Sequence, residues 1–482
     1  RIEDTDQTRF VPGAEEYIIE ALKWCGIEPN EGVGFGDGVY KPYRQSERKA
    51  MYREFAEQLV KSENAYYAFD SSEELDEARQ RMEKAGGSFM YNAITRQNMK
   101  NSLSLSDDEV QKRIAARENY VIRIKIPRNE EIRLQDIIRG WVVVHSSQMD
   151  DKVLFKSDGM PTYHLANVVD DYTMKITHVI RGEEWLPSAP LHVLLYRYLG
   201  WESVMPEFAH LPLLLRPDGN GKLSKRDGDR LGFPVFPLNW NPESGEKASG
   251  YKEAGYFPEA FINMLALLGW HASGNKELFS LEELVQEFSL DRVSKSGAKF
   301  DPEKTKWFNQ QYLRTKSDEE LATVFKEEVK RQKAARLPTL KLNEVGQEGN
   351  TDFEYVKKVC ALIKEKASFL NEFWSLGSYF FIEPESYDAD VVKKRWNDKS
   401  KNFIAELAKA YQSANDFSAA SAENILKQTC EKLEMKTGEI MQVFRVCISG
   451  LGGGPALFEI AALLGKEKVI KRLETAVNAI KS

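Results

Sequence analysis

Apolar residues recur every three to four positions in two stretches near the start of the chain. The first stretch covers residues 14–25. The second runs through Tyr52, Phe55 and Leu59 and follows Ser46, a residue type that often begins a helix. This spacing predicts two amphipathic helices, each with one face buried against a core.

Residues 63–156 follow a different pattern. Short apolar or alternating runs predict strands, over residues 120–126, 141–144 and 152–155. Polar helical segments are predicted between them, over residues 72–85 and 106–119. The change of pattern predicts a separate α+β module inserted into the first fold.

After this module, a strand is predicted over residues 176–180, with Arg181 at its carboxyl end. Ser188 and Gly200 are suited to bound a helix that follows the strand. Strand, charged loop and helix in this order form a βα unit of a parallel sheet, and ligands bind at the carboxyl edge of such sheets. Residues 209–215 predict one further strand.

The remainder of the chain changes character twice. Residues 229–256 are rich in Pro, Gly, Asn and Ser and predict an irregular segment. Helical periodicity then dominates to the end of the sequence, over residues 258–268, 281–288, 318–333, 352–370, 386–412, 418–434, 437–449 and 455–478. We therefore predict an α/β part followed by a mostly α-helical part.

Composition narrows the class of protein. The 482 residues suggest about three domains, and 42% hydrophobic with 29% charged residues is typical of a soluble globular protein. No run of 18 apolar residues occurs, so no membrane span is expected. The net charge of −7 gives no global signal for nucleic acid, so any such site must be a local patch. The four cysteines are far apart, which predicts reduced thiols in a cytoplasmic protein and no zinc site.

Candidate phosphate chemistry lies in the segment Gly219-Asn-Gly-Lys-Leu-Ser-Lys-Arg-Asp-Gly228, where Lys222, Lys225 and Arg226 fall between glycines. A mobile cationic loop can meet negative charge as it develops on a phosphate. A solvated basic turn is the alternative for such a run. The acidic segment Arg1-Ile-Glu-Asp-Thr-Asp6 is predicted to end a strand at a ligand edge, with a solvated turn as its alternative.

Five motifs in this order resemble bacterial glutamyl-tRNA synthetase, a class I aminoacyl-tRNA synthetase. They are Arg1-Ile-Glu-Asp-Thr-Asp6, Pro42-Tyr-Arg-Gln-Ser-Glu-Arg48, Pro161-Thr-Tyr-His-Leu-Ala-Asn-Val-Val-Asp-Asp171, Ile180-Arg-Gly-Glu-Glu-Trp185 and Lys222-Leu-Ser-Lys-Arg226. The segment 453–466 is similar to that family's C-terminal helices. The resemblance covers nearly the whole chain. It implies a Rossmann-like nucleotide-binding catalytic domain with an inserted α+β module and an all-α anticodon-binding region.

The resemblance implies that ATP with Mg²⁺ and L-glutamate form glutamyl-adenylate, and that glutamate is then transferred to the tRNA for glutamate. Lys222 and Lys225 would be the catalytic cations at the pyrophosphate. The glutamate-binding residues would be Glu3, Tyr163, Asn167 and Arg181, and the ATP-binding residues Glu184, Trp185, Leu214 and Lys225. From the residues alone, other roles stay open: Tyr163 and Trp185 as core aromatics, Asn167 in a turn, and Arg181 paired with Asp170 or Asp171.

The resemblance also implies domain boundaries. The catalytic domain would comprise residues 1–62 and 157–215, with the acceptor-end module over 63–156, a stem-contact region over 216–300, and two anticodon-binding helical domains over 301–375 and 376–482. The basic run 326–336 would touch tRNA phosphates or form a solvated helix face, since Glu327 and Glu328 lie within it.

The sequence departs from the family at two places. The His-x-Gly-His signature and the first strand are absent before Arg1, so an impaired ATP site is expected in the chain as it stands. The Cys-x-Cys of some relatives is replaced by Ala68 and Asp70, so no structural zinc is expected. A cytoplasmic monomer without membrane contact is expected. The alternatives are an enzyme that also charges glutamine tRNA, a glutaminyl enzyme, or a non-catalytic tRNA-binding relative; the helical C-terminal part argues against the glutaminyl type and against a short base-modifying paralogue.

Overall fold

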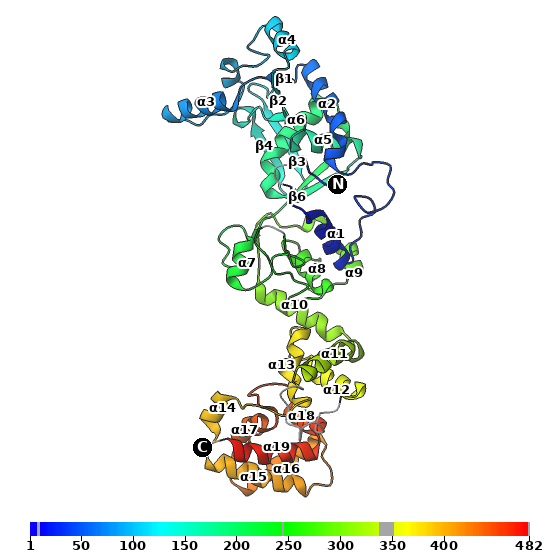
Figure 1. Cartoon of the computed structure of the whole chain (residues 1–482), viewed down its shortest axis with the longest axis vertical. Coiled ribbons are helices and arrows are strands. Elements are labelled where there is room, and N and C mark those ends of the chain that lie inside the picture. Colours follow the sequence, from blue (N-terminus) through cyan, green and yellow to red (C-terminus); the bar gives the residue numbers. More distant parts are fainter. Residues whose placement is uncertain (7–9, 243–244, 337–350, 481–482) are drawn as a thin grey trace. The chain divides into compact units, whose positions relative to one another are not determined.

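The computed structural model describes residues 1–6, 10–242, 245–336 and 351–480; the side chains at positions 225, 229 and 336 also lie outside the description. The chain divides into two compact units (Figure 1). Unit 1 comprises Arg1–Tyr251 and Ile262–Asp301, and unit 2 comprises Lys252–Phe261 and Pro302–Ser482. In the described ranges, no helix is long and apolar enough to cross a membrane.

Unit 1 contains a four-stranded sheet in the order β4-β3-β7-β6. Its strands are β3 (Glu131–Asp136), β4 (Gly140–His145), β6 (His178–Gly182) and β7 (Glu207–Leu211). β3 and β4 form an antiparallel hairpin, whereas β7 runs parallel to both β3 and β6. The parallel register pairs Arg181 of β6 with His210 of β7, so both side chains lie on the same face at the carboxyl edge. The predicted βα unit around Arg181 is confirmed.

A second sheet of three antiparallel strands has the order β1-β2-β5, formed by β1 (Ala65–Ala68), β2 (Val121–Ile124) and β5 (Val153–Phe155). The strands predicted over 120–126, 141–144 and 152–155 correspond to β2, β4 and β5. β3 was not predicted, and it joins β4 to the sheet of β6 and β7. One core of buried side chains, including Ile122, Leu154 and Phe208, connects both sheets. The segment 63–156 therefore shares its packing with the rest of unit 1.

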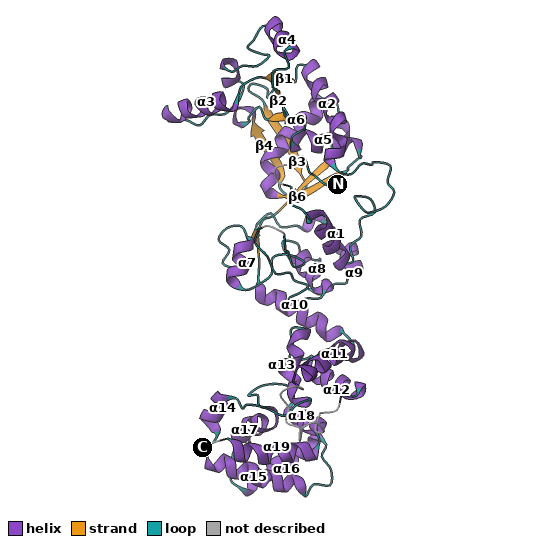
Figure 2. Cartoon of the chain, viewed as in Figure 1, coloured by secondary structure: helices purple, strands orange, loops and turns teal. Residues whose placement is uncertain are grey.

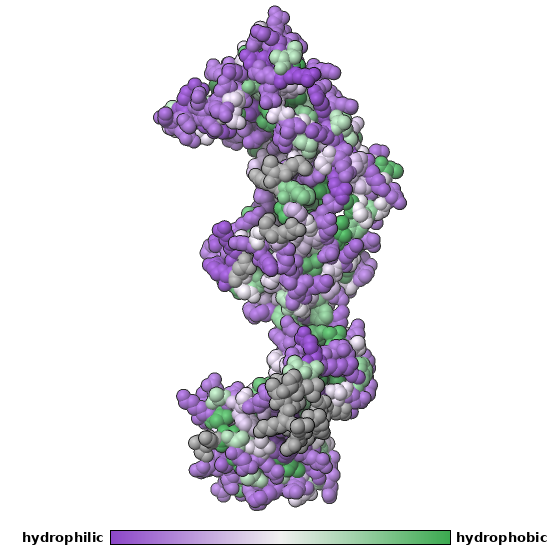
Figure 3. All heavy atoms as spheres, in the orientation of Figure 1, coloured by the Kyte–Doolittle hydropathy of each residue, from purple (hydrophilic) through white to green (hydrophobic). Residues whose placement is uncertain are grey.

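Three helices pack against these sheets, α2 (Lys49–Lys61), α5 (Tyr163–Thr173) and α6 (Ala189–Tyr198), and Figure 2 shows them beside the strands. The same unit also contains α1 (Ala14–Trp24), α3 (Ser72–Lys84) and α4 (Asp107–Ala115). α3 begins with a capping box between Ser71 and Glu74, and mostly hydrophilic residues cover it on the face seen in Figure 3. Ser188 precedes α6 as predicted, but its hydroxyl makes no cap hydrogen bond.

The rest of unit 1 follows the sheet. β8 (Leu214–Leu215) pairs in parallel with β9 (Ala298–Lys299), and α7 (Lys225–Leu231) and α9 (Leu281–Glu287) lie between them in sequence. The predicted cationic loop is partly wrong, because Lys225 and Arg226 form the first turn of α7. The Asp227 carboxylate accepts hydrogen bonds from the Ser224 N–H (3.0 Å) and hydroxyl (2.5 Å), which stabilises the start of this helix.

Unit 2 is helical in its described residues. α8 (Pro258–Leu267) begins in it, and further helices follow as α10 (Pro302–Thr315), α11 (Asp318–Arg336), α12 (Phe353–Ile363), α13 (Phe373–Gly377), α14 (Ala389–Arg395), α15 (Asp398–Gln412), α16 (Ala419–Lys432), α17 (Thr437–Ser449), α18 (Leu457–Leu464) and α19 (Lys466–Ala479). The helices predicted over 386–412 and 455–478 are each two helices, because Asn397 caps a new start and Gly465 has a positive φ of 85°. The predicted order of an α/β part and an α-helical part is confirmed.

Candidate functional site

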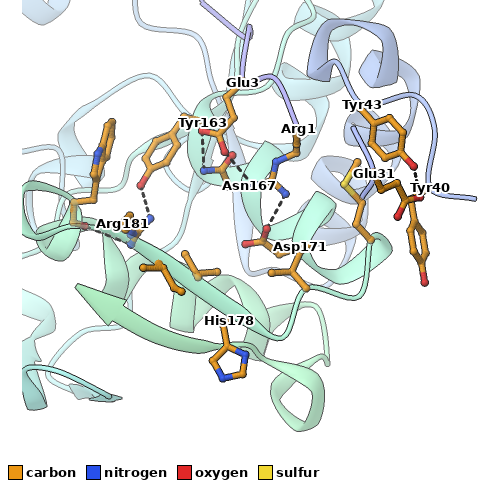
Figure 4. A pocket seen from close by; sticks show the side chains of 15 residues that line it. Arg1, Glu3, Glu31, Tyr40, Tyr43, Tyr163, Asn167, Asp171, His178 and Arg181 are labelled. Atoms are coloured by element: carbon orange, nitrogen blue, oxygen red, sulfur yellow. Dashed lines mark hydrogen bonds and ion pairs between the residues drawn. The ribbon is translucent and has the colours of Figure 1, made fainter. Parts of the chain in front are cut away.

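A cavity of about 480 Å³ lies at the carboxyl edge of β6 (Figure 4). Its lining comes from the N-terminal segment, from α5, from β6 and from the 3₁₀ helix η5 (Glu183–Ser188). All four residues predicted to bind glutamate line it, and Trp185 lines it as well: Glu3, Tyr163, Asn167, Arg181 and Trp185. The fold therefore brings together side chains that are up to 182 positions apart in the sequence.

Arg181 is held on three sides. Its Nε–H donates to Nε2 of His210 at 3.0 Å, one terminal nitrogen donates to the Tyr163 hydroxyl at 3.0 Å, and the other donates to the Trp185 carbonyl at 3.4 Å. Within the described residues, no carboxylate lies within ion-pair distance of Arg181. Its charge is therefore available to an anionic ligand.

The alternative in which Arg181 pairs with Asp170 or Asp171 is wrong. Asp170 lies 2.8 Å from Nε of Arg48, and Asp171 lies 2.7 Å from a terminal nitrogen of Arg1. Both carboxylates thus have other arginine partners. Burial raises the pKa of Asp171, and the neighbouring Arg1 acts against that shift.

Tyr163 and Trp185 line the cavity rather than the core. Trp185 is 46% exposed, and its ring centroid lies 4.9 Å from that of Tyr163. The Tyr163 hydroxyl also lies 2.7 Å from the hydroxyl of Ser188, which in turn donates to the Trp185 carbonyl. This explains why Ser188 does not cap α6: its hydroxyl is used by the site. Burial raises the pKa of Tyr163, so the phenol stays protonated, and its one O–H donates to the Ser188 oxygen because the Ser188 proton is used by Trp185.

Asn167 lies within α5 and is 7% exposed, so the interpretation as a turn residue is wrong. Its Oδ1 accepts a hydrogen bond from Nε2 of Gln45 at 3.0 Å, and its Nδ2 lies 3.4 Å from a carboxylate oxygen of Glu3. The same Gln45 nitrogen donates to Asp170 at 3.0 Å. Because Gln45 occupies the oxygen, Asn167 directs its N–H donors toward the cavity.

Two more histidines lie behind Tyr163. His164 Nδ1 lies 3.3 Å from Nε2 of His192, and the Tyr163 ring is 5.4 Å from the His192 ring. Burial lowers the pKa of His164 to about 4 and lowers that of His192 as well. This wall of the cavity is therefore uncharged near neutral pH.

A second cavity of about 450 Å³ is lined by Glu184, Leu214 and Lys222 together with mostly apolar residues. The Lys222 ammonium lies 2.7 Å from a Glu184 carboxylate oxygen, and this contact lowers the pKa of Glu184. The Leu214 carbonyl accepts from the Leu223 N–H at 2.7 Å, which holds the cationic segment beside β8. Three of the residues predicted to act on ATP are thus brought together, and Trp185 follows Glu184 directly. The side chain of Lys225 lies outside the described residues.

Sequence reasoning missed several residues of the site. Gln45 lies in the motif 42–48, but the sequence alone indicates no role for it, and for His210 the pattern predicts only a position in a strand. Asp136, whose carboxylate lies 2.6 Å from Nδ1 of His210, was not considered. In the described ranges, no group of three or more His, Cys, Asp or Glu side chains is arranged to hold a metal ion.

Comparison with known proteins agrees with this geometry. Residues 1–307 match the family described as "tRNA synthetases class I (E and Q), catalytic domain", and residues 320–477 match "Anticodon binding domain". The chain is 52% identical to the glutamate–tRNA ligase of Cytophaga hutchinsonii over 480 residues, which is 99% of this chain and 90% of that protein. It is 53% identical to that of Flavobacterium psychrophilum over 477 residues, covering 99% and 91%.

Solved structures give the same answer. The crystal structure of a glutamate tRNA ligase from Elizabethkingia meningosepticum in complex with its amino acid superposes with a TM-score of 0.88 at 46% identity, covering 100% of this chain and 92% of that one. A glutamate-tRNA synthetase from Elizabethkingia anophelis gives a TM-score of 0.86 at 46% identity, covering 99% and 92%. This chain belongs to the class I (E and Q) tRNA synthetase family.

Proposed function

We propose that this chain is a glutamate–tRNA ligase, which joins L-glutamate to its tRNA at the expense of ATP. The observation that carries the proposal is the unpaired charge of Arg181, held by the Tyr163 hydroxyl, in one cavity with the amide donors of Asn167 and the carboxylate of Glu3. Glutamate carries two carboxylates and one ammonium. A guanidinium with hydrogen-bond donors on one side and a carboxylate on the other matches this charge pattern.

The donors also favour glutamate over glutamine. Arg181 can only donate hydrogen bonds, and the Gln45 contact leaves Asn167 with its N–H groups toward the cavity. A carboxylate oxygen satisfies such donors, whereas the amide N–H₂ of glutamine would meet donors and leave polar groups unpaired. In this scheme Glu3 binds the substrate ammonium, Asn167 and Arg181 bind carboxylate oxygens, and Tyr163 lines the glutamate pocket and holds Arg181.

The cationic segment would serve the ATP half of the reaction. A glutamate carboxylate oxygen attacks the α-phosphorus of Mg²⁺-bound ATP, the bond to the β-phosphate oxygen breaks, and pyrophosphate leaves. Lys222 and Lys225 would stabilise the charge that develops on the pyrophosphate. In this structure Lys222 is paired with Glu184 and would have to exchange that partner for phosphate. Glu184, Trp185 and the backbone at Leu214 would bind the adenosine. A hydroxyl of the ribose at the 3′ end of the tRNA then attacks the carbonyl carbon of glutamyl-adenylate, and AMP leaves.

The remaining roles are proposals from the domain order. Residues 63–156 would bind the acceptor end of the tRNA, 216–300 its stem, and the helical regions 301–375 and 376–482 its anticodon. Some cations of the run 326–336 are already paired within α11, as Lys330 with Glu327 and Arg331 with Glu328, which favours a solvated face for them; the Arg336 side chain lies outside the described residues. We propose that the protein is cytoplasmic and monomeric. Size-exclusion chromatography with light scattering would test the monomeric state.

Charging assays test the proposed function directly. Purified full-length protein is incubated with ATP, Mg²⁺, labelled glutamate and either glutamate tRNA or glutamine tRNA. Charging of glutamate tRNA supports the proposal, and charging of both tRNAs identifies an enzyme that accepts either. Pyrophosphate exchange that depends on glutamine rather than glutamate would refute it. Arg181→Gln should raise the KM for glutamate, whereas Arg133→Gln, a matched change of an exposed arginine on β3, should not.

A further inference from the structure

A neutral side chain, that of His210, accepts a hydrogen bond from Arg181 and helps to hold it in place. His210 is fully buried on β7, directly opposite Arg181 in the parallel register, and its Nε2 lies 3.0 Å from Nε of Arg181. Asp136 is also fully buried at the end of β3, with its Oδ2 2.6 Å from Nδ1 of His210. The three side chains form a line from the interior of the sheet to the cavity.

Asp136 and Arg181 together determine which ring nitrogen of His210 carries the proton. Oδ1 of Asp136 accepts from the backbone N–H groups of Ile138 (3.0 Å) and Arg139 (2.8 Å) and, at 3.3 Å, from that of His210. Burial alone would raise the pKa of Asp136, but the His210 ring and these backbone donors outweigh it and lower the pKa. A carboxylate only accepts and a guanidinium only donates. His210 must therefore carry its proton on Nδ1 and present a bare Nε2 to Arg181.

A neutral acceptor has an advantage at this position. A carboxylate behind Arg181 would fix the side chain but would also neutralise the charge that the substrate needs. The imidazole fixes Nε and leaves the charge in place. The described hydrogen bonds use three of the five N–H donors of Arg181, which leaves one on each terminal nitrogen for a ligand.

We propose that Asp136 and His210 are positioning residues for glutamate binding: Asp136 sets the tautomer of His210, and His210 holds the Arg181 guanidinium in its binding orientation without neutralising it. The proposal rests on the proposed function, since it assigns Arg181 to the substrate carboxylate. Neither residue touches the substrate. Their loss should therefore weaken glutamate binding and leave the ATP site unchanged.

Two substitutions separate this role from a merely structural one. His210→Leu keeps the bulk and removes the acceptor. Asp136→Asn can keep the backbone contacts at Oδ1 while its Nδ2 donates to Nδ1 of His210, which moves the ring proton to Nε2 and sets two donors face to face. His210→Gln should restore function, because its Oε1 can accept from Arg181. His145→Leu is the matched control, since His145 is an exposed residue of β4.

Steady-state charging with varied glutamate and varied ATP provides the first measurement. Loss of a hydrogen bond to a charged group corresponds to about a 10- to 100-fold rise in KM. We expect such a rise in the glutamate KM for His210→Leu and Asp136→Asn, with the ATP KM nearly unchanged, and recovery in His210→Gln. Equal rises in both KM values, or a lowered melting temperature with an unchanged glutamate KM, would overturn the proposal.

Selective ¹⁵N labelling of the six histidines provides a readout independent of activity. The His210 signals, assigned by their absence in His210→Gln, should show the Nδ1–H form in the wild type and the Nε2–H form in Asp136→Asn. A wild-type ring with its proton on Nε2 would refute the proposal even if the protein charges glutamate. Failure of the full-length wild type to charge glutamate would instead refute the proposed function, while the tautomer would still report on the hydrogen bonds.

The His210 ring, between Asp136 and Arg181, should stay neutral in mild acid. The charged and titratable groups that face the His210 ring are Asp136 from β3, Arg139 from the turn after it, Arg181 from β6 and His192 from α6. Burial lowers the pKa of His210, and Arg181 and Arg139 lower it further against the opposing effect of Asp136. The wild-type glutamate KM should therefore not rise as the pH falls from neutral to about 6.5, where an ordinary histidine is half protonated. A KM that rises within this range would contradict a neutral ring.

Discussion

Asp170 offers the sharpest test of how the site is supported. Its carboxylate is fully buried and accepts from Nε of Arg48 at 2.8 Å, from the Tyr52 hydroxyl at 2.9 Å and from Nε2 of Gln45 at 3.0 Å. The Arg48 side chain is only 4% exposed. Asp170→Asn would remove the charge that compensates this buried guanidinium. Breaking one partner of a buried ion pair destabilises a protein by about 3–5 kcal/mol, a large share of the usual stability.

Hydrogen–deuterium exchange read by mass spectrometry suits this prediction, because the chain has two units that need not unfold together. Exchange of α5 peptides should accelerate by about 100-fold or more in Asp170→Asn, in line with the loss of at least 3 kcal/mol. Peptides of α15, in unit 2, provide the reference. Arg48→Met should produce a similar effect, and the double variant should be more stable than the sum of the two losses predicts, because no unpaired buried charge remains.

The reasoning would be refuted if Asp170→Asn changed α5 exchange by less than about fivefold, or if the two single effects added without coupling. A functional consequence is also expected. Gln45 donates to both Asp170 and Asn167 from one nitrogen, so a change at Asp170 should disturb the amide that faces the cavity. The glutamate KM should therefore rise together with the loss of local stability.

Three further predictions concern other parts of the chain. Lys225→Ala should slow adenylate formation, measured by quench-flow, by roughly 100-fold and leave tRNA affinity, measured by filter binding, nearly intact. Lys276→Ala, a change of an exposed lysine paired with Glu283, should alter neither quantity. His164 has a pKa near 6.5 in the unfolded chain and of about 4 in the folded chain, so the unfolded chain binds its proton first as the pH drops. The free energy of unfolding should therefore fall by up to about 3 kcal/mol between these two pH values, and urea unfolding should show a smaller fall in His164→Gln. Arg472→Met should lower the stability of unit 2 by about 3 kcal/mol in exchange of α17 and α19 peptides, because the buried guanidinium donates to the carbonyls of Tyr379, Ile382 and Ile448.

Local sequence patterns were sufficient to predict residues that line the cavity. Arg181 follows an apolar strand and precedes a helix, and this order alone places it at the ligand edge of a sheet. The pattern could not reveal what lies behind it. His210 is 29 positions from Arg181 and 74 from Asp136, and the contacts arise only when β3, β7 and β6 align side by side.

The missed elements have local causes. β3 contains only two apolar side chains, Ile132 and Leu134, so its alternation is short and was not recognised. In unit 2, an apolar stripe that continues across Gly465 was interpreted as one helix, although the positive φ of this glycine ends α18. Cations and glycines dominate the sequence around the start of α7 and predict a loop, whereas the Ser224–Asp227 contact stabilises the first turn of a helix.

The buried polar residues around the cavity explain why these supports are hidden from sequence patterns. Gln45, Asp136, Asp170 and His210 are all fully buried, and apolar residues of similar size would avoid the desolvation of charged and polar groups at these positions. Their presence has a physical reason if each fixes a group that the substrate needs, since a side chain held only by apolar contacts keeps its rotational freedom. On this argument, Asp136→Asn together with His210→Leu, which keeps the acceptor for the Ile138 and Arg139 N–H groups and leaves no buried charge unpaired, should cost less stability than His210→Leu alone and still weaken glutamate binding. Stability and binding would then separate at two residues that never touch the substrate.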